Sequence, residues 1–393
     1  MLTATAISAA SSFVVLLVVA PALGPAGYAS FSVYWAALFM AVGILFGVQQ
    51  EATRAVSDAR PATSENIRGA SVLRFAGVLS AALLIPLLAA GLLLAGPLFG
   101  AANSAWAYPL AIAVAAYVGV AAVNGVLAGS GRWGAFAAIP LIDGILRLIL
   151  VAGVLWTGAD GTALAWAVAV PFPVSLLLVG TARWRSLRAH SVVDESYRSL
   201  GMNVSRTVIA STANAVLVNG FPVVLSIVAG DDRVALGIVI LALTLTRAPI
   251  LVPLTALQSM LIAQFSASPQ RARRLMLTVL CGLAVLTPLL AAVAGLWGPD
   301  ALVWLFDGFD APGALLAWLV VASGCLGVLT VTGARVLAAG RHGVFATGWV
   351  LACALAIVAV AITPGDVGTR AVVGLIAGPL VGAGYHLVVG RRR

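Results

Sequence analysis

The chain has 393 residues, of which 62% are apolar and only 9% are charged, and its mean hydropathy is +1.10. Charged residues make up about a quarter of an ordinary soluble domain, so this composition excludes a soluble globular protein. The formal net charge of +9 does not indicate a nucleic-acid partner, because the positive-inside rule for membrane proteins accounts for the positions of most of the arginines.

Apolar runs long enough to cross a hydrocarbon core, which takes roughly 20 helical residues, recur along the whole chain. They predict an all-α polytopic membrane protein with about twelve transmembrane helices. No connection is long enough to hold a soluble domain, so function is expected to reside among the helices. The predicted spans lie at residues 5–22, 31–49, 75–95, 108–128, 136–156, 163–182, 205–228, 235–264, 275–296, 313–331, 344–362 and 371–388.

Charge alternates between successive connections. Arginines concentrate in every second one, which the positive-inside rule assigns to the cytoplasm. The remaining connections carry acids such as Asp160, Asp232 and Asp366 and are expected to face outward. Both termini are then cytoplasmic, and the expected location is the bacterial cytoplasmic membrane. The first apolar stretch has no basic region before it, which disfavours a cleaved signal peptide.

An internal repeat indicates duplication. The segment Val126-Leu-Ala-Gly-Ser-Gly-Arg-Trp-Gly-Ala-Phe136 reappears, one residue shorter, as Val336-Leu-Ala-Ala-Gly-Arg-His-Gly-Val-Phe345. Two homologous halves of six spans each would enter the membrane with the same polarity. We therefore expect two parallel-repeat six-helix lobes around a central cavity, at residues 1–182 and 205–393, joined by a cytoplasmic linker at 183–204.

Polar residues in the seventh predicted span form a stripe. Asn203, Thr207, Ser211 and Asn214 are spaced four, four and three residues apart, which places them on one helical face. Such a face has to point into the bundle, where it either lines a cavity or forms hydrogen bonds between helices.

Arg247 lies deep in the eighth predicted span and is followed by Pro249 and Pro253, with Gln258 on the same face. A charge at that depth costs about 2.5 to 3.5 kcal/mol on insertion scales. We therefore favour a functional, cavity-facing role over snorkelling or pairing with an acid.

Three further arginines are candidates for anion binding. Arg147 is four residues after Asp143 in the fifth span, a spacing that permits an ion pair, and this pair fits a structural salt bridge and a functional site equally well. Arg54 and Arg206 lie at the cytoplasmic ends of the second and seventh spans. They would suit a phosphate headgroup, although they also fit ordinary positive-inside residues.

The sequence lacks the residues that several kinds of transport coupling and catalysis require. Asp143 is the only acid inside a predicted span, whereas proton or sodium antiporters usually carry membrane carboxylates. The chain has no Walker A sequence, no cysteine–histidine cluster and no nucleophile elbow. We expect no enzymatic activity, no cofactor and no metal site.

Five segments together resemble the polysaccharide and lipid-linked oligosaccharide flippases of the multidrug/oligosaccharidyl-lipid/polysaccharide (MOP) exporter superfamily. They are Leu23-Gly-Pro-Ala-Gly-Tyr-Ala-Ser-Phe-Ser32, Gln49-Gln-Glu-Ala-Thr-Arg54, Asp143-Gly-Ile-Leu-Arg147, Thr246-Arg-Ala-Pro249 and Val336-Leu-Ala-Ala-Gly-Arg-His342.

The resemblance implies alternating-access transport of a polyprenyl-pyrophosphate-linked glycan to the outer leaflet. By position it implies pyrophosphate binding by Arg54, Arg147 and Arg247. Expected partners are the lipid-linked glycan, membrane lipids, and glycosyltransferases or a polymerase of the same pathway. The alternatives are a multidrug-type or major-facilitator-type exporter, a membrane glycosyltransferase, for which the outer loops are short, and a transport-inactive scaffold of cell-wall assembly.

Overall fold

The computed structural model describes residues 2–59, 69–267 and 269–390, and these are almost entirely helical. Because a bilayer offers no water to unpaired backbone groups, apolar runs of this length are stable as helices. The elements of the first half are α1 (Leu2–Asp58), β1 (Ala70–Ser71), α2 (Val72–Phe99), the 3₁₀ helix η1 (Ala101–Trp106), α3 (Ala107–Gly129), α4 (Trp133–Thr157), α5 (Gly161–Ala169), α6 (Pro171–Ala182), α7 (Trp184–His190) and β2 (Val192–Val193). Those of the second half are α8 (Tyr197–Val218), α9 (Phe221–Ala229), α10 (Arg233–Ala267), α11 (Pro269–Leu305), α12 (Gly313–Ala338), α13 (His342–Ile362) and α14 (Val367–Val389).

The predicted spans all correspond to helices. Among the described residues, ten helices are long and apolar enough to cross a membrane, or eleven when α8 and α9, which are bent by 60° at their junction, count as one span. The long helix α1 contains both of the first two predicted spans, with a non-helical Gly24 (φ 63°, ψ 175°) between them. The chain is therefore a multi-pass membrane protein whose spans match the twelve apolar runs.

The chain forms two compact units. Unit 1 contains residues 1–22 and 30–223, and unit 2 contains residues 23–29 and 224–393. The lobe boundaries expected from the sequence, with a linker at 183–204, stay a prediction.

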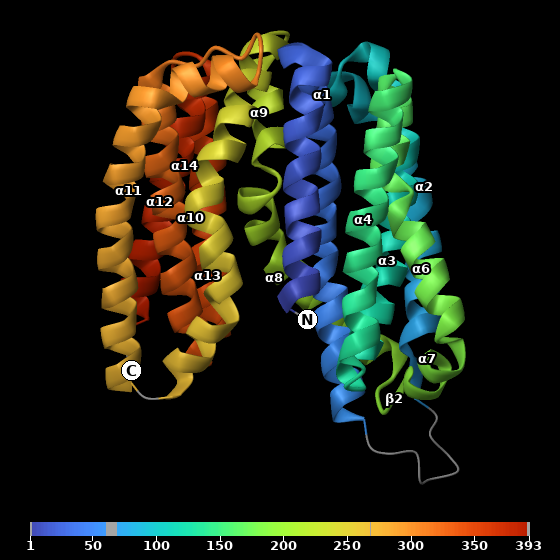
Figure 1. Cartoon of the computed structure of the whole chain (residues 1–393). Helices are drawn as coiled ribbons and strands as arrows, with labels where there is room; N and C mark the ends of the chain where they lie inside the picture. Colours follow the sequence, from blue (N-terminus) through green and yellow to red (C-terminus); the bar gives the residue numbers. More distant parts are fainter. Residues whose placement is uncertain (1, 60–68, 268, 391–393) are drawn as a thin grey trace. The chain divides into compact units, whose positions relative to one another are not determined.

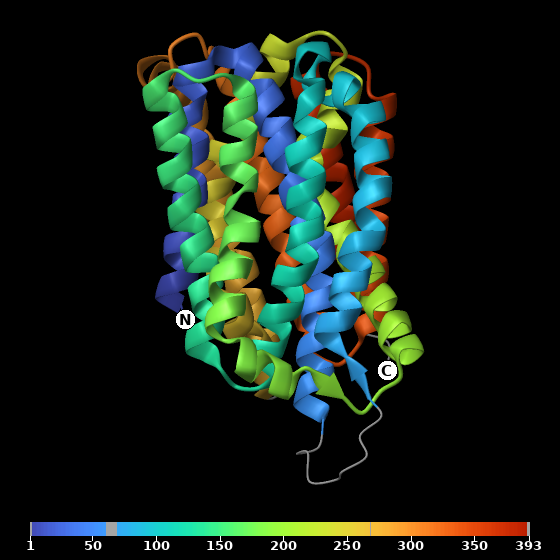
Figure 2. The ribbon, with the colours of Figure 1, turned by 90° about the vertical axis from the view of Figure 1, so that its right-hand side faces the viewer.

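In unit 1, a very short β-ribbon lies at one end of the helices (Figure 2). Ala70 pairs with Val193 and Ser71 with Val192 in antiparallel register, and the backbone N–H of Val72 donates to the carbonyl of Ser191 at 2.8 Å. The ribbon therefore fixes the segment before α8 against the start of α2. Two residues per strand carry no detectable periodicity, which is why the sequence indicated only a linker here.

In unit 2, α11, α12 and α14 lie side by side (Figure 1). The segment at residues 23–29 belongs to this unit. A Cβ on Gly237 of α10 would lie 2.0 Å from the carbonyl oxygen of Pro25, and the rings of Tyr28 and Phe309 meet edge to face at 5.7 Å between centroids. These contacts hold the first of the five segments against α10 and against the connection that contains Phe309.

The duplicated segment adopts the same turn in both halves. Gly131 and Gly340 have φ values of 72° and 71°. The following arginine N–H donates five residues back, from Arg132 to Leu127 at 2.8 Å and from Arg341 to Val336 at 3.2 Å. Both are therefore Schellman-type helix ends, which need a left-handed residue that glycine supplies at little cost.

The other glycines with positive φ also occur in pairs, one in each half of the chain. All eight in the described chain fall into four matched pairs at corresponding connections of the two halves: Gly24 and Gly230, Gly100 and Gly308, Gly131 and Gly340, and Gly158 and Gly365. The duplication that the sequence predicts is therefore present in the backbone.

Acids of the predicted outer connections cap helices. The Asp160 carboxylate accepts from the Ala163 N–H at 2.9 Å, Asp232 from Ala235 at 3.0 Å, and Asp366 from Thr369 at 2.7 Å. A carboxylate at this position satisfies an N–H group that the first helical turn leaves free. Capping of the following helix is thus one reason why acids occur in these connections.

Candidate functional site

The best-defined buried polar site is the Asp143–Arg147 pair of α4, inside unit 1. Arg147 Nη2 donates to both carboxylate oxygens of Asp143, at 2.8 and 2.7 Å, and Arg147 Nε donates to the carbonyl of Val168 in α5 at 3.2 Å. Arg147 is 1% exposed and Asp143 8%. The ion pair that the sequence spacing permits is therefore formed and buried.

Three aromatic rings surround the same guanidinium. Its carbon lies 5.8 Å from the ring centre of Trp35, 5.1 Å from that of Phe39 and 4.9 Å from that of Phe172. A cation within about 6 Å of a ring face is attracted by the ring quadrupole. These three rings were not predicted from the sequence, although Trp35 and Phe39 are four residues apart in the second span and so lie on one helical face.

The geometry of Arg147 favours the structural alternative that the sequence left open. Its Nε and Nη2 groups donate to protein acceptors, its charge is balanced by Asp143, and three aromatic rings surround it. In this conformation the side chain has almost no accessible surface to offer a pyrophosphate. The corresponding place in the second half holds Ala356, which is buried against Gly378, so the common fold does not require an arginine here.

Arg54 is similarly engaged with acids. Near the end of α1, it forms ion pairs with Glu51 and Asp58 of the same helix and with Glu195, which lies between β2 and α8. Ser199 and Asn203 donate to the second Glu195 oxygen at 3.1 and 3.2 Å. Because three carboxylates share one guanidinium, Arg54 carries little free positive charge for a phosphate.

The Glu195 carboxyl has a perturbed pKa. The hydrogen bond from Arg54 is the largest cause and, with those from Ser199 and Asn203, holds this pKa below that of an ordinary glutamate. Glu195 is therefore ionised at neutral pH and fixes the beginning of α8 to the end of α1.

Most residues of the polar stripe of α8 donate hydrogen bonds within unit 1. Thr207 Oγ1 donates to the carbonyl of Gly47 in α1 at 2.9 Å, and a Cβ on Gly47 would lie 2.5 Å from the Val208 nitrogen. Ser211 Oγ donates to the carbonyl of Thr207 at 2.9 Å. For Thr207, the structure thus favours contact between helices over cavity lining, whereas Asn214 is half-buried and its cavity-lining role stays a prediction.

The remaining candidates lie apart from the Arg147 site in sequence. Arg247 is half-buried in α10, which continues through Pro249 and Pro253, and Arg206 is exposed on α8. The side chain of Gln258 lies outside the described residues. Substrate binding by Arg247, Arg206 and Gln258 therefore stays a prediction.

The described residues contain no group of three or more histidine, cysteine, aspartate or glutamate side chains placed to hold a metal ion. The three cysteines, Cys281, Cys325 and Cys353, are free thiols.

The arrangement of helices has a known counterpart. The structure of a multidrug resistance MATE family transporter of the MOP superfamily, in an inward-facing conformation, superposes with a TM-score of 0.71 and 16% sequence identity over 100% of this chain and 94% of that one. A MOP superfamily transporter from Pyrococcus furiosus matches with a TM-score of 0.65 and 17% identity over 100% and 93%. The chain therefore has the fold of the MATE transporters, which supports the MOP-type architecture and not the major-facilitator one.

Sequence relatives define the family more narrowly. The protein Mb3654 of Mycobacterium bovis is 33% identical over 98% of this chain and 90% of its own length, and Rv1510 of Mycobacterium tuberculosis is 32% identical over 99% and 90%. The chain belongs to the family of these mycobacterial proteins. No protein-family model matches it.

Proposed function

We propose that this protein is a transporter that works by alternating access and moves a polyprenyl-pyrophosphate-linked glycan from the cytoplasmic to the outer leaflet of the bacterial cytoplasmic membrane. The observation that carries the transport proposal is the likeness to MOP transporter folds over the whole chain. A MOP-type fold with duplicated halves is the architecture on which alternating access operates.

The pairing of the buried acids supports a lipid-linked substrate over proton-driven drug export. Glu51 and Asp143 are the buried acidic residues of the described chain, and each is bound by an arginine, Arg54 and Arg147 respectively. A proton-coupled antiporter needs a membrane carboxylate that can release and rebind a proton. A carboxylate whose oxygens are held by a guanidinium is poorly suited to that cycle.

A phosphorylated head provides another source of driving force. A pyrophosphate diester carries about two negative charges, and an inside-negative potential favours the outward movement of each by roughly 2.3 kcal/mol per 100 mV. Transport of such a substrate therefore does not require a coupling ion.

The arginines are assigned different tasks in this proposal. Arg247 and Arg206 remain the candidates for direct contact with the pyrophosphate. Arg54 and Arg147 are assigned to positioning, because their guanidinium groups are engaged with carboxylates of unit 1. The lipid-linked glycan and the enzymes that make and polymerise it are the proposed partners.

Small-molecule export is the second candidate, because the MATE transporter that shares this fold is described as a multidrug resistance protein. The two candidates differ in substrate and in coupling. A drug exporter would use a proton or sodium gradient to accumulate an organic cation. A flippase would equilibrate a lipid-linked glycan between the leaflets without such a gradient.

The discriminating experiment uses the full chain in phosphatidylcholine vesicles that contain a polyprenyl-diphosphate-linked oligosaccharide in both leaflets. An impermeant reagent that modifies the sugar reaches only the outer half in protein-free vesicles. Reconstituted protein is expected to make the protected half accessible within minutes. If this half stays protected while the same preparation accumulates a cationic dye under a proton gradient, the flippase proposal is wrong and the exporter is favoured.

A further inference from the structure

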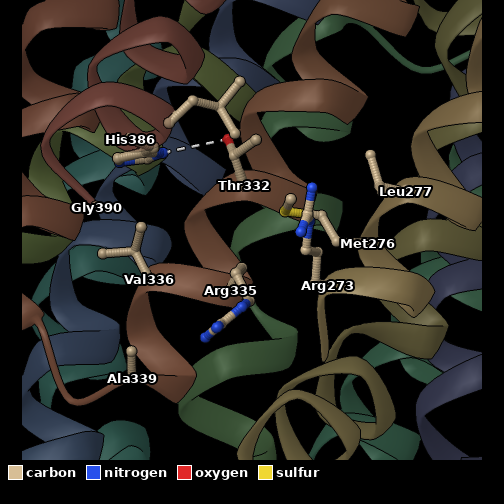
Figure 3. A pocket seen from close by; sticks show the side chains of 10 residues that line it. Arg273, Met276, Leu277, Thr332, Arg335, Val336, Ala339, His386 and Gly390 are labelled. Atoms are coloured by element: carbon tan, nitrogen blue, oxygen red, sulfur yellow. Dashed lines mark hydrogen bonds between the residues drawn. The ribbon is translucent and has the colours of Figure 1, made fainter. Parts of the chain in front are cut away.

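A pocket of about 560 Å³ lies in unit 2 where the beginning of α11 meets the ends of α12 and α14. Figure 3 shows side chains from these helices around it. Arg273, Met276 and Leu277 come from α11, Thr332 and Arg335 from α12, and His386 from α14. This volume is in the range of small-ligand pockets, about 300–1,000 Å³.

The pocket is positively charged. Arg273 and Arg335 both line it, and none of its lining residues is acidic. Within the part of the chain that the structure describes, neither guanidinium has a hydrogen bond or ion pair. This distinguishes them from Arg54 and Arg147, whose charges are balanced by acids. Two guanidinium groups from neighbouring helices favour an oxyanion, and their planar forks match phosphate geometry.

The wall beside these arginines is preformed. His386 is 2% exposed, and its Nε2 donates to the carbonyl of Phe345 at 3.2 Å while its Nδ1 lies 3.3 Å from Thr332 Oγ1. A Cβ on Gly348 would lie 2.1 Å from Nε2, so the imidazole fills space that only a glycine leaves. The histidine and threonine are thus fixed before any ligand arrives.

The surface next to the pocket is apolar and exposed. Leu277 lines the pocket and is 47% exposed, and the exposed side chains Val285, Leu289 and Leu296 continue along α11. In a membrane-spanning helix such residues face lipid tails. A ligand with an anionic head and apolar chains would fit both parts, whereas a free anion would use only the first.

We propose that this pocket binds the phosphate headgroup of an anionic phospholipid, with the acyl chains lying along α11. Arg273 and Arg335 contact the phosphate. The charge distribution assigns this end of the helices to the cytoplasmic side, where anionic lipids bind basic pockets between helices. The proposal does not depend on the transported substrate, because the site lies within unit 2 and the lipid remains in its leaflet.

The test is lipid binding by the intact protein, purified in a neutral detergent and titrated with phosphatidylglycerol or phosphatidylcholine while bound lipid is counted by native mass spectrometry. The wild type is expected to bind one phosphatidylglycerol about tenfold more tightly than phosphatidylcholine. Arg273→Gln combined with Arg335→Gln should abolish this preference. Arg274→Gln is the matched control, because it removes an adjacent, exposed arginine of α11 that does not line the pocket.

Each outcome decides the proposal. Equal binding of the two lipids by the wild type would overturn it without any variant, and so would a folded double variant that keeps the wild-type preference. Folding is checked by elution volume and melting temperature in phosphatidylcholine. Inorganic phosphate should displace the lipid only weakly. If it displaces phosphatidylglycerol at equal concentration, the pocket holds free phosphate and the lipid assignment is wrong.

Discussion

Arg54, near the end of α1, forms an ion pair with Glu195, which follows it by 141 residues and lies between β2 and α8. The same guanidinium also binds Glu51, so one side chain connects a buried acid of α1 to the segment that precedes α8. The sequence suggested a phosphate ligand at Arg54, but the contact is one that holds unit 1 together.

The Arg54–Glu195 pair predicts a pH-dependent stability. The pKa of Glu195 is lowered in the folded protein, chiefly by the Arg54 hydrogen bond. The stabilisation is therefore complete above the unfolded-state pKa of about 4.3 and is lost as the pH falls through the lower folded-state value. At pH 7, Glu195→Gln should lower the free energy of unfolding by at most about 1 kcal/mol, because the pair is partly exposed.

Melting curves in detergent between pH 7 and pH 3 measure this effect. The gap between wild type and Glu195→Gln should be constant near neutrality and should narrow as the pH falls below about 4.3, towards the lowered folded-state pKa of Glu195. Asp58→Asn provides a comparison, since its more exposed carboxylate contacts Arg54 within α1. A gap as wide at pH 3 as at pH 7 would contradict the role assigned to the Glu195 charge.

Removing Arg147 alone is expected to be severely destabilising. Arg147→Met would leave the buried Asp143 carboxylate without its guanidinium partner, at a cost of about 3–5 kcal/mol. Asp143→Asn combined with Arg147→Met should recover much of that loss. Thermal melting and the yield of monodisperse protein measure both, and similar stability for the single and double variants would argue against the buried pair.

Exchanging the two residues is a different test. The sequence alone predicts that a purely structural pair tolerates the exchange. In the structure, however, a carboxylate at position 147 would face the rings of Trp35, Phe39 and Phe172 and the carbonyl of Val168, all of which repel an anion. We therefore expect the exchanged protein to be unstable, and its loss of activity would not indicate substrate contact. Wild-type stability would disprove the aromatic enclosure.

The repeated turn predicts matched effects in the two halves. Gly131→Ala and Gly340→Ala should each cost about 1–2 kcal/mol, because an L-residue is strained at positive φ although a Cβ would have open space at both sites. Gly134→Ala and Gly343→Ala are the controls: both sites are helical and equally open. They should be neutral or slightly stabilising in the same melting assay. Equal effects at all four positions would contradict the conformational explanation.

Arg247→Ala is expected to abolish translocation of the lipid-linked glycan without changing the amount of protein in the membrane. Arg247→Lys keeps the charge but loses the fork that pairs with two phosphate oxygens, so we expect partial activity. Initial rates in the vesicle assay, normalised to reconstituted protein, measure both. Wild-type translocation by the alanine variant would remove Arg247 from the proposed site.

The sequence was a good guide to the helices and the duplication. Apolar length decides a transmembrane helix, and glycine is needed where the backbone turns left-handed, so the spans and the paired turns at Gly131 and Gly340 were both predictable. The Asp143–Arg147 pair was also predictable, because both residues are on one helix.

The surroundings of these residues were not predictable. Trp35, Phe39 and Phe172 come from helices distant in sequence, and in an apolar chain nothing distinguishes an aromatic ring that meets a cation from one that meets lipid. The partner of Arg54 was missed for the same reason, since Glu195 lay in a segment that appeared to be only a charged linker. Contacts between helices decide whether an arginine is free for a ligand, and composition does not record them.

The most direct test of the transport account is the initial rate at which the reconstituted protein moves a polyprenyl-diphosphate-linked glycan outward under an imposed inside-negative potential. We predict a rate well above that of protein-free vesicles, increased further by the potential and unaffected by a pH gradient. A rate equal to that of protein-free vesicles, or one that responds to the pH gradient and not to the potential, would contradict the account.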